Sequence, residues 1–311
     1  MTLAILCSGQ GRQHREMFAL TGDAPEADAL FAHAATLLGG RDPREMVRSN
    51  PSEGLYGNRV AQILCSLQAL AAMKALGDAV PERIIVAGYS VGEVAAWGAA
   101  GFLSMTDTLD LVARRAELMS AVSPSGDGML FVRGVSREAI EKLCEGHDAA
   151  VAIANPGDAF VIGGSGAALE ALAHDARAMN ASNVVRLPVE VASHTKRLAI
   201  ASPQFREILS HLRMSFPRAG TRLLSGVDGA PVLRLEAGLD KLAAQISRTV
   251  HWDACLQGCI EAGATAFLEL GPGPALSQMA AGAYRDVSAR CLEDFRTLQG
   301  VRAWVARSAS Y

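Results

Sequence analysis

The sequence predicts an α/β protein with a large domain built on a parallel sheet and a small second domain inserted into it. Short apolar runs that end in glycine-rich turns alternate with helical patterns through most of the chain. Between residues 127 and 191 the order changes to strand, helix, strand, strand, helix, strand. Composition agrees, since 50% of the 311 residues are hydrophobic, only 5% are aromatic, and 30 glycines suit many tight turns.

The first part of the large domain carries its clearest elements. An apolar strand at residues 3–7 runs directly into a glycine loop at residues 9–11. Residues 83–89 are typical of a buried strand, because β-branched residues follow one another there. Helices are expected at residues 60–76, with Gly77 as a stop signal, and at residues 92–100 and 105–121.

The inserted segment predicts a ferredoxin-like βαββαβ domain. Its strands are expected at residues 129–134, 149–154, 159–163 and 184–191, and its helices at 137–145 and 167–180. We therefore expect a small domain at 127–191 and a large domain made of 1–126 and 192–311. The large domain resumes with a helix from Lys196, a strand at 221–224, a helix from Leu235 and a strand at 264–270.

Charge and cysteine content exclude several classes of protein. The net charge of −3, with both signs mixed, argues against nucleic-acid binding through a broad basic face. The six cysteines form no CxxC pair and no metal-ligand spacing, so no metal site is expected, and Cys255 and Cys259 are interpreted as buried apolar residues. The N-terminus lacks a signal-peptide pattern, and no stretch approaches the roughly 20 apolar residues of a membrane span. We expect a soluble cytoplasmic protein.

The strongest chemical signal is the GxSxG pattern of residues 88–92, placed between a buried strand and a helix. A serine on that sharp turn, here Ser90, exposes its hydroxyl, and the flanking glycines relieve crowding. The N–H groups at the start of the helix, that of Val91 among them, would face a developing oxyanion. This context makes the large domain α/β-hydrolase-like and favours a nucleophile over an ordinary glycine-rich turn.

A serine nucleophile needs a base, and the chain has seven histidines. His194 is favoured because it follows the strand predicted at 184–191 and precedes a helix, so its side chain can reach the end of another strand. The loop residues His14 and His251 remain alternatives. The others lie in or beside predicted helices, where a surface role is expected: His33, His147, His174 and His211.

Two further residues stand out by position. Arg115 shares a helix face with Leu111, Val112 and Met119, so it is a cation on an apolar face and needs an anion. A structural salt bridge and a clamp for a substrate carboxylate explain it equally well. Gln10, in the loop after the first strand, could complete an oxyanion hole together with Val91, or be a plain turn residue.

These residues together resemble the malonyl-CoA:acyl carrier protein transacylase family. The shared motifs are GQGxQ at 9–13, GxSxGE at 88–93, an arginine at position 115, Ser193-His194, and Glu-Leu-Gly-Pro-Gly at 269–273. Within the family the chain is most similar to the malonate decarboxylase epsilon subunit, which has GYSVGE where fatty-acid enzymes have GHSLGE. The segment CLEDFRTLQGVRAW at 291–304 is similar too.

The resemblance implies an acyltransferase that moves a malonyl group from malonyl-CoA to the thiol of an acyl carrier protein. It implies Ser90 as the acyl-carrying nucleophile, His194 as its base and Arg115 as the partner of the malonyl carboxylate. Gln10 would hold the oxyanion site.

Two more residues take roles from the resemblance. Asn155 matches an active-site asparagine from the small domain, and Gln245 matches the segment whose backbone carbonyl orients the histidine. Tyr89 departs from the family, which usually has histidine beside the nucleophile, and Cys7-Ser8 stands where Phe-Pro is common.

The expected transfer is ping-pong, with coenzyme A thioester as substrate and no bound cofactor. The partner would be the carrier subunit of a malonate decarboxylase, or else the carrier of fatty-acid or polyketide synthesis, and the family suggests a monomer. Two alternatives of another class remain. One is a thioesterase or esterase, although no acid precedes His194 in the manner of a hydrolase triad. The other is an inactive docking subunit.

Overall fold

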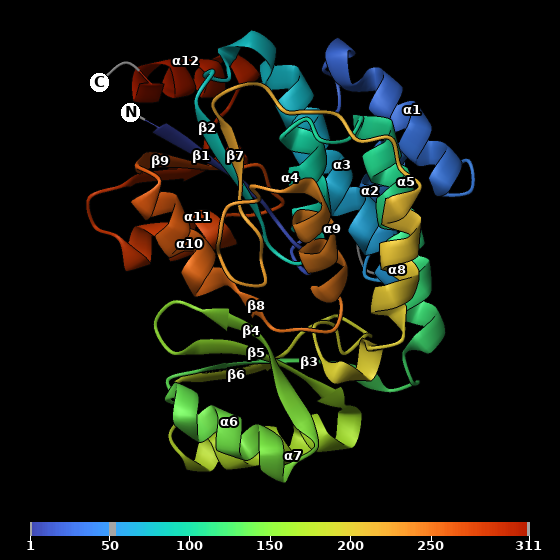
Figure 1. Ribbon diagram of the computed structural model, residues 1–311, viewed down its shortest axis with the longest axis vertical. Coiled ribbons are helices and arrows are strands. Elements are labelled where there is room, and N and C mark those ends of the chain that lie inside the picture. Colours follow the sequence, from blue (N-terminus) through green and yellow to red (C-terminus); the bar gives the residue numbers. More distant parts are fainter. Residues whose placement is uncertain (1, 50–53, 310–311) are drawn as a thin grey trace.

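The computed structural model describes residues 2–49 and 54–309, and its main feature is a parallel sheet with helices on both faces (Figure 1). The sheet has five strands in the order β10-β9-β1-β2-β7, and every neighbouring pair is parallel. The α/β fold with a parallel sheet is therefore as predicted. Its strands are β1 (Thr2–Cys7), β2 (Ile84–Gly88), β7 (Thr221–Leu223), β9 (Ala264–Glu269) and β10 (Ser288–Cys291).

The central strand β1 is apolar throughout because both of its faces are buried. Leu3 and Ile5 pack into one hydrophobic core, with α3 and α4. Ala4 and Leu6 point the other way, into a second core that contains Trp252 of α10. Successive side chains on a strand face opposite sides, so one short apolar run anchors two helical layers.

Helices surround the large sheet. Their bounds are α1 (Asp28–Leu37), α2 (Pro43–Ser49), α3 (Asn58–Leu76), α4 (Val91–Ala99), α5 (Met105–Val122), α8 (Ala201–Ser210), α9 (Leu235–Ala244), α10 (Trp252–Glu261), α11 (Ala275–Ala283) and α12 (Leu298–Ala309). Short 3₁₀ turns lie at Pro25–Ala27, Gly77–Ala79, Lys196–Leu198 and Leu292–Asp294. As predicted, α3 ends at Gly77, which has a φ of 51° and donates its N–H to the Met73 carbonyl.

The expectation that no segment is long and apolar enough to span a membrane is wrong for α3. Together with the following 3₁₀ turn, this helix passes the test of length and composition at Asn58–Ala79. However, 78% of its most apolar window is buried inside the protein. The core helix of a soluble protein passes the same test, because its whole circumference contacts other elements.

A second, smaller sheet forms the lower part of the molecule in Figure 1. The segment predicted as the small domain supplies β3 (Asp127–Arg133), α6 (Arg137–Gly146), β4 (Ala149–Asn155), β5 (Ala159–Ser165), α7 (Gly166–Ala178) and β6 (Asn183–Arg186), in the predicted order. The strands of this segment are antiparallel and lie in the order β6-β3-β5-β4. One face of the sheet packs on α6 and α7 through Leu130, Val132 and Ile162.

Two details differ from the prediction. The last strand of the small sheet was expected to reach residue 191, but β6 ends at Arg186. Pro188 lies just beyond and has no N–H to give to a ladder, and the N–H of Val189 turns back to the Leu187 carbonyl. The sheet also gains a fifth strand, β8 (Val250–His251), from outside residues 127–191, and it pairs parallel to β4.

The turn after β2 is packed too tightly for side chains larger than hydrogen. A Cβ added to Gly92 would lie 2.1 Å from the Cys7 carbonyl oxygen, and one on Gly88 would lie 2.1 Å from the Gly92 carbonyl oxygen. The ends of β1 and β2 and the start of α4 are thus in direct backbone contact. Any residue on this turn is held at the edge of the large sheet that faces the small one (Figure 1).

We expect Gly92→Ala to destabilise the fold by about 1–3 kcal/mol or more, because the new methyl overlaps backbone that cannot move aside. Urea unfolding of the variant and the wild type measures the difference. Gly146→Ala is the matched control, since nothing lies within 4 Å of that position at the end of α6. Equal midpoints for Gly92→Ala and wild type would contradict the close packing.

Candidate active site

Ser90 occupies the N-cap of α4 in a strained backbone conformation. Its φ is 57° and its ψ is −121°, a region that residues with a side chain rarely adopt. The Gly88 and Gly92 contacts described above hold it there. The strain turns the hydroxyl away from the strand and helix that flank it, as the GxSxG pattern predicts.

Ser90, His194 and Gln245 form a hydrogen-bonded chain. The Ser90 Oγ lies 2.7 Å from His194 Nε2, and His194 Nδ1 lies 2.5 Å from the backbone carbonyl oxygen of Gln245. A carbonyl only accepts hydrogen bonds, so Nδ1 carries the proton and Nε2 is free to accept from the serine. The His194 N–H donates to the Ile246 carbonyl at 2.8 Å, which fixes the backbone of the histidine as well.

The environment of His194 keeps its imidazole neutral. The residue is 1% exposed, and burial lowers its pKa to about 3, with the Arg115 charge acting in the same direction. The hydrogen bond to the Gln245 carbonyl opposes this shift only in part. A neutral imidazole is the form that can take a proton from a hydroxyl.

Arg115 lies on α5 and is buried, as its place on an apolar helix face predicts. Its guanidinium donates to the side-chain oxygen of Gln62 at 2.6 Å and to that of Gln245 at 3.0 Å. Among the described residues it forms no direct ion pair, and its Nε has no partner. The structural salt bridge considered from the sequence is therefore replaced by two neutral amides.

Glu93 is the nearest carboxyl to this arrangement. The Gln245 amide bridges it to the rest of the site, because Gln245 Nε2 donates to Glu93 Oε2 and to the Ser90 carbonyl, both at 2.8 Å. Burial raises the pKa of Glu93 to about 7, against the opposing effects of the Gly226 N–H, the Gln245 amide and the Arg115 charge. Burial also lowers the pKa of Arg115 to about 10.

Two backbone N–H groups remain available beside the nucleophile. Val91 is the first residue of α4, and neither its N–H nor that of Gln10 donates to another backbone group in the described chain. The loop that carries Gln10 is fixed by Gln13, whose side chain accepts from the Gly11 N–H and donates to the Leu55 carbonyl at 3.0 Å. Free N–H groups on a rigid loop and at a helix start are the groups that stabilise an oxyanion.

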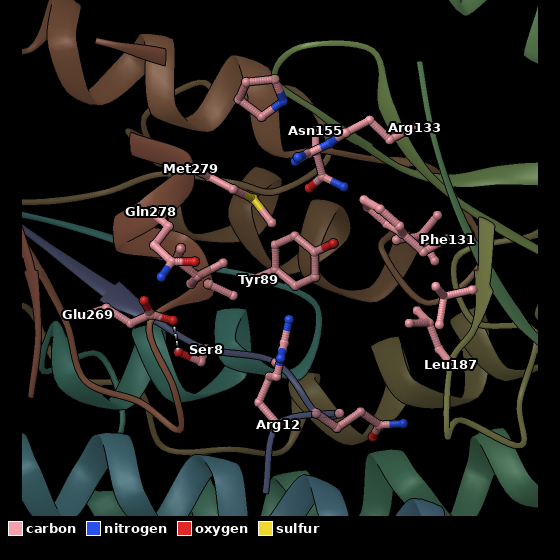
Figure 2. A pocket seen from close by; sticks show the side chains of 18 of the residues that line it. Ser8, Arg12, Tyr89, Phe131, Arg133, Asn155, Leu187, Glu269, Gln278 and Met279 are labelled. Carbon is pink, nitrogen blue, oxygen red and sulfur yellow. Dashed lines mark hydrogen bonds between the residues drawn. The ribbon is translucent and has the colours of Figure 1, made fainter. Parts of the chain in front are cut away.

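A cavity of about 910 Å³ lies between the two sheets (Figure 2). Tyr89, which precedes Ser90, lies on its wall and packs edge-on against Trp252 at 5.4 Å between ring centroids. Asn155, at the end of β4, lines the cavity, and its buried side-chain amide has no partner of hydrogen-bond geometry in the described chain. Gln10 lines the same cavity.

The Glu269 carboxylate at the end of β9 ties the loop after β1 to α11. Ser8 Oγ donates to one of its oxygens at 2.7 Å (Figure 2). The N–H and hydroxyl of Ser277 donate to the other at 2.8 and 3.0 Å. Burial raises the pKa of Glu269 to about 7, although these hydrogen bonds oppose it. Ser8 is where the sequence departs from the common Phe-Pro, and its hydroxyl makes a bond that proline cannot.

The predicted residues thus fall into two groups. Ser90, His194, Arg115 and Gln245 are joined by hydrogen bonds, whereas Gln10 and Asn155 lie on the cavity wall. Gln62 and Glu93 were missed as site residues. The signal was present, since both are polar side chains in helices whose residues are mostly apolar and buried.

In the described chain none of the competing histidines is hydrogen-bonded to Ser90, and His251, one of the two loop alternatives, lies in β8. Four of them face acidic side chains at 2.8–2.9 Å outside this site, in the pairs His14–Glu293, His33–Asp110, His147–Asp175 and His211–Glu207. All six cysteines are free and buried, as interpreted from the sequence for Cys255 and Cys259. Within residues 2–49 and 54–309 no group of three or more His, Cys, Asp or Glu side chains could hold a metal ion.

The chain is similar to several known proteins in sequence and in structure. The chain is 32% identical to the malonyl CoA-acyl carrier protein transacylase of Mycobacterium bovis over 299 residues, covering 94% of this chain and 96% of that protein. It superposes on an acyl-carrier-protein S-malonyltransferase from Burkholderia pseudomallei with a TM-score of 0.88 at 27% identity, covering 97% of this chain and 100% of that one.

A third relative is a malonyl-transacylase in complex with its type II PKS acyl-carrier protein. It matches with a TM-score of 0.89 at 25% identity, covering 97% of this chain and 99% of that one. The sequence also matches the acyl transferase domain family over residues 5–297, which is most of its length and includes every site residue described above. The chain belongs to the acyl transferase domain family.

Proposed function

We propose that the protein transfers a malonyl group from malonyl-CoA to the thiol of an acyl carrier protein, through an ester on Ser90. The observation that carries this proposal is the short distance of 2.7 Å between Ser90 Oγ and His194 Nε2. The Gln245 side-chain amide links this pair to the buried Arg115 guanidinium. The relatives with matching folds include malonyl transacylases, one of them bound to a carrier protein.

In the first half-reaction Ser90 Oγ attacks the thioester carbonyl while His194 Nε2 takes the hydroxyl proton. The backbone N–H groups of Gln10 and Val91 hold the oxyanion that forms. The tetrahedral intermediate then collapses, the carbon–sulfur bond breaks, and His194 returns the proton to the leaving coenzyme A thiolate. Ser90 now carries the malonyl group as an ester.

The second half-reaction reverses these steps with a new thiol. His194 takes the proton of the carrier thiol, and the sulfur attacks the Ser90 ester at the same oxyanion site. Ser90 leaves as the alkoxide and recovers the proton from His194. Because one thioester replaces another of similar energy, we propose that no resident cofactor or metal takes part.

Arg115 gives the site its preference for an acyl group with a free carboxylate. The guanidinium is buried, and its Nε has no partner in the described chain, so a carboxylate that enters meets an unused donor. A hydrogen bond to a charged group contributes about 1.5–3 kcal/mol, which corresponds to roughly tenfold to hundredfold in selectivity. An acetyl group offers nothing to this donor.

The finer proposal is that the carrier is the carrier subunit of a malonate decarboxylase. It rests on GYSVGE at the nucleophile and on the similarity of residues 291–304 to the epsilon subunit. Tyr89, one of the two residues that distinguish this motif, precedes Ser90 and lines the cavity. Comparing acceptors that bear a phosphoribosyl-dephospho-coenzyme A group with acceptors that bear phosphopantetheine tests this assignment.

Four further assignments belong with this proposal. The protein acts in the cytoplasm. It is a monomer, and light scattering of the purified protein tests this oligomeric state. Its large domain, at 1–126 and 192–311, is α/β-hydrolase-like. Its small domain, at 127–191, is ferredoxin-like, which the βαββαβ order and the strand order β6-β3-β5-β4 support.

Ser90→Ala is expected to abolish the malonyl adduct, because Ser90 Oγ is the hydroxyl that His194 Nε2 contacts in the described chain. Intact mass spectrometry after incubation with malonyl-CoA measures the adduct directly. Steady release of coenzyme A without an adduct in the wild type would indicate a thioesterase. Neither adduct nor release would indicate a docking subunit.

Arg115→Ala is expected to lower kcat/KM for Ser90 acylation by malonyl-CoA about tenfold or more, and to leave acetyl-CoA nearly unchanged. Arg114→Ala is the matched control, since Arg114 lies on the same helix but is exposed and pairs with Glu117. Wild-type protein that loads acetyl and malonyl groups equally well would contradict the role of Arg115.

The rate of Ser90 acylation is expected to stay high as the pH falls from 8 to about 5. His194 has a pKa of about 3, so its base form persists throughout this range. An inflection near pH 7 would belong to Glu93 or Glu269, because burial raises the pKa of both to about 7, and it should disappear in Glu93→Gln or Glu269→Gln. Stopped-flow release of coenzyme A at each pH measures the profile, and a loss of rate near pH 6.5 that survives both substitutions would contradict a buried neutral histidine.

A further inference from the structure

The cavity between the two sheets is positively charged. Two arginines line it, Arg12 from the loop after β1 and Arg133 from the end of β3, and the only acidic residue among its lining is Glu269. Figure 2 shows both arginine side chains at the cavity, entering from different sides, with Tyr89 and Asn155 between them. The two halves of the molecule therefore each contribute one cation to the same space.

Both of these arginines lack a partner. In the part of the chain that the structure describes, neither the Arg12 nor the Arg133 guanidinium forms an ion pair or a hydrogen bond, and Arg133 only lies over the Phe131 ring at 5.7 Å. Arg44, Arg197 and Arg206, by contrast, each pair with two carboxylates. Unpaired guanidinium groups that face one cavity favour an anion there.

Glu269 does not neutralise this charge. Its two carboxylate oxygens accept from Ser8 and from Ser277, so they are directed at the loop after β1 and at α11. Burial also keeps its pKa near 7, which leaves part of the population uncharged at neutral pH. The field in the cavity is therefore set by Arg12 and Arg133.

The size and the apolar walls of the cavity indicate that the anionic group belongs to a long ligand. A volume of about 910 Å³ far exceeds what an acyl group of three carbons needs. Apolar side chains form much of the wall, among them Phe131, Leu187 and Met279. Tyr89 and Gly9 line the cavity, and a Cβ built on Gly9 would lie 3.4 Å from the Ser90 Cβ, so a long ligand in the cavity lies close to the nucleophile.

We propose that Arg12 and Arg133 form an anion subsite for the phosphate groups at the far end of a pantetheine arm, while the arm itself lies along the apolar wall. The inference rests on the proposed function, because it deepens the description of that substrate. Two sources share this chemistry. One is the nucleotide diphosphate of the coenzyme A donor, and the other is the phosphodiester of a carrier prosthetic group.

The test compares thioesters with and without phosphate. We expect Arg12→Ala and Arg133→Ala each to raise KM for malonyl-CoA about tenfold and to leave KM for malonyl-pantetheine within about twofold. A loss confined to transfer onto the carrier, with malonyl-CoA unchanged, assigns the subsite to the carrier phosphodiester instead. Either result supports the subsite. Equal losses with malonyl-CoA and malonyl-pantetheine, or no loss with any substrate, overturn it.

Two controls make the result specific. Arg15→Ala removes an exposed arginine from the same loop that pairs with Glu16 and does not line the cavity, so its KM values should match wild type. Arg12→Lys keeps the charge and should recover part of the affinity.

Calorimetric titration with coenzyme A and with pantetheine tests the proposed anion subsite independently of the proposed transfer reaction. It needs no turnover, so it tests the subsite even if wild-type protein forms no malonyl adduct with either donor. Tighter binding of coenzyme A than of pantetheine, lost in Arg12→Ala, supports the subsite. Equal binding of the two ligands excludes coenzyme A as the source, and together with unchanged transfer onto the carrier it overturns the subsite.

Discussion

The candidate active site depends on one residue, Gln245, which holds four groups in place at once. Its backbone carbonyl orients His194, and its side-chain amide donates to the Ser90 carbonyl and to Glu93 while it accepts from Arg115. A glutamine can do this because its amide presents a donor and an acceptor with no net charge. A carboxylate at this place would pair directly with Arg115 and remove the donor that a substrate needs.

The neutral amides explain how a buried cation can remain available. An unpaired guanidinium in a protein interior is costly, and a direct ion pair would satisfy it permanently. Here Gln62 and Gln245 satisfy two of its donors, and Glu93 balances its charge from one amide away. The same positive charge adds to the effect of burial and lowers the pKa of His194, so the clamp and the base are electrostatically coupled.

The fold was predictable where a short local sequence pattern determines the structure. Apolar runs long enough to be buried on both faces predicted β1 and β2, and the GxSxG turn predicted the position of Ser90. The positions of β8 and of the end of β6 were not predictable, since they depend on pairing between distant segments and on a proline just past the strand.

In the site, the apolar helix face predicted that Arg115 is buried. The pattern could not predict its partners, because Gln62 lies in α3 and Gln245 just after α9, and only tertiary packing brings the two together.

The most direct measurement is a crystal structure of the protein after reaction with malonyl-CoA, with the acyl group on Ser90. The central claim is that this site recognises the acyl group by its free carboxylate. The account predicts a malonyl carboxylate about 2.7–2.9 Å from the Arg115 guanidinium and an ester oxygen facing the N–H groups of Gln10 and Val91. An ester whose carboxylate points into the cavity, with Arg115 still bound only to Gln62 and Gln245, would contradict it.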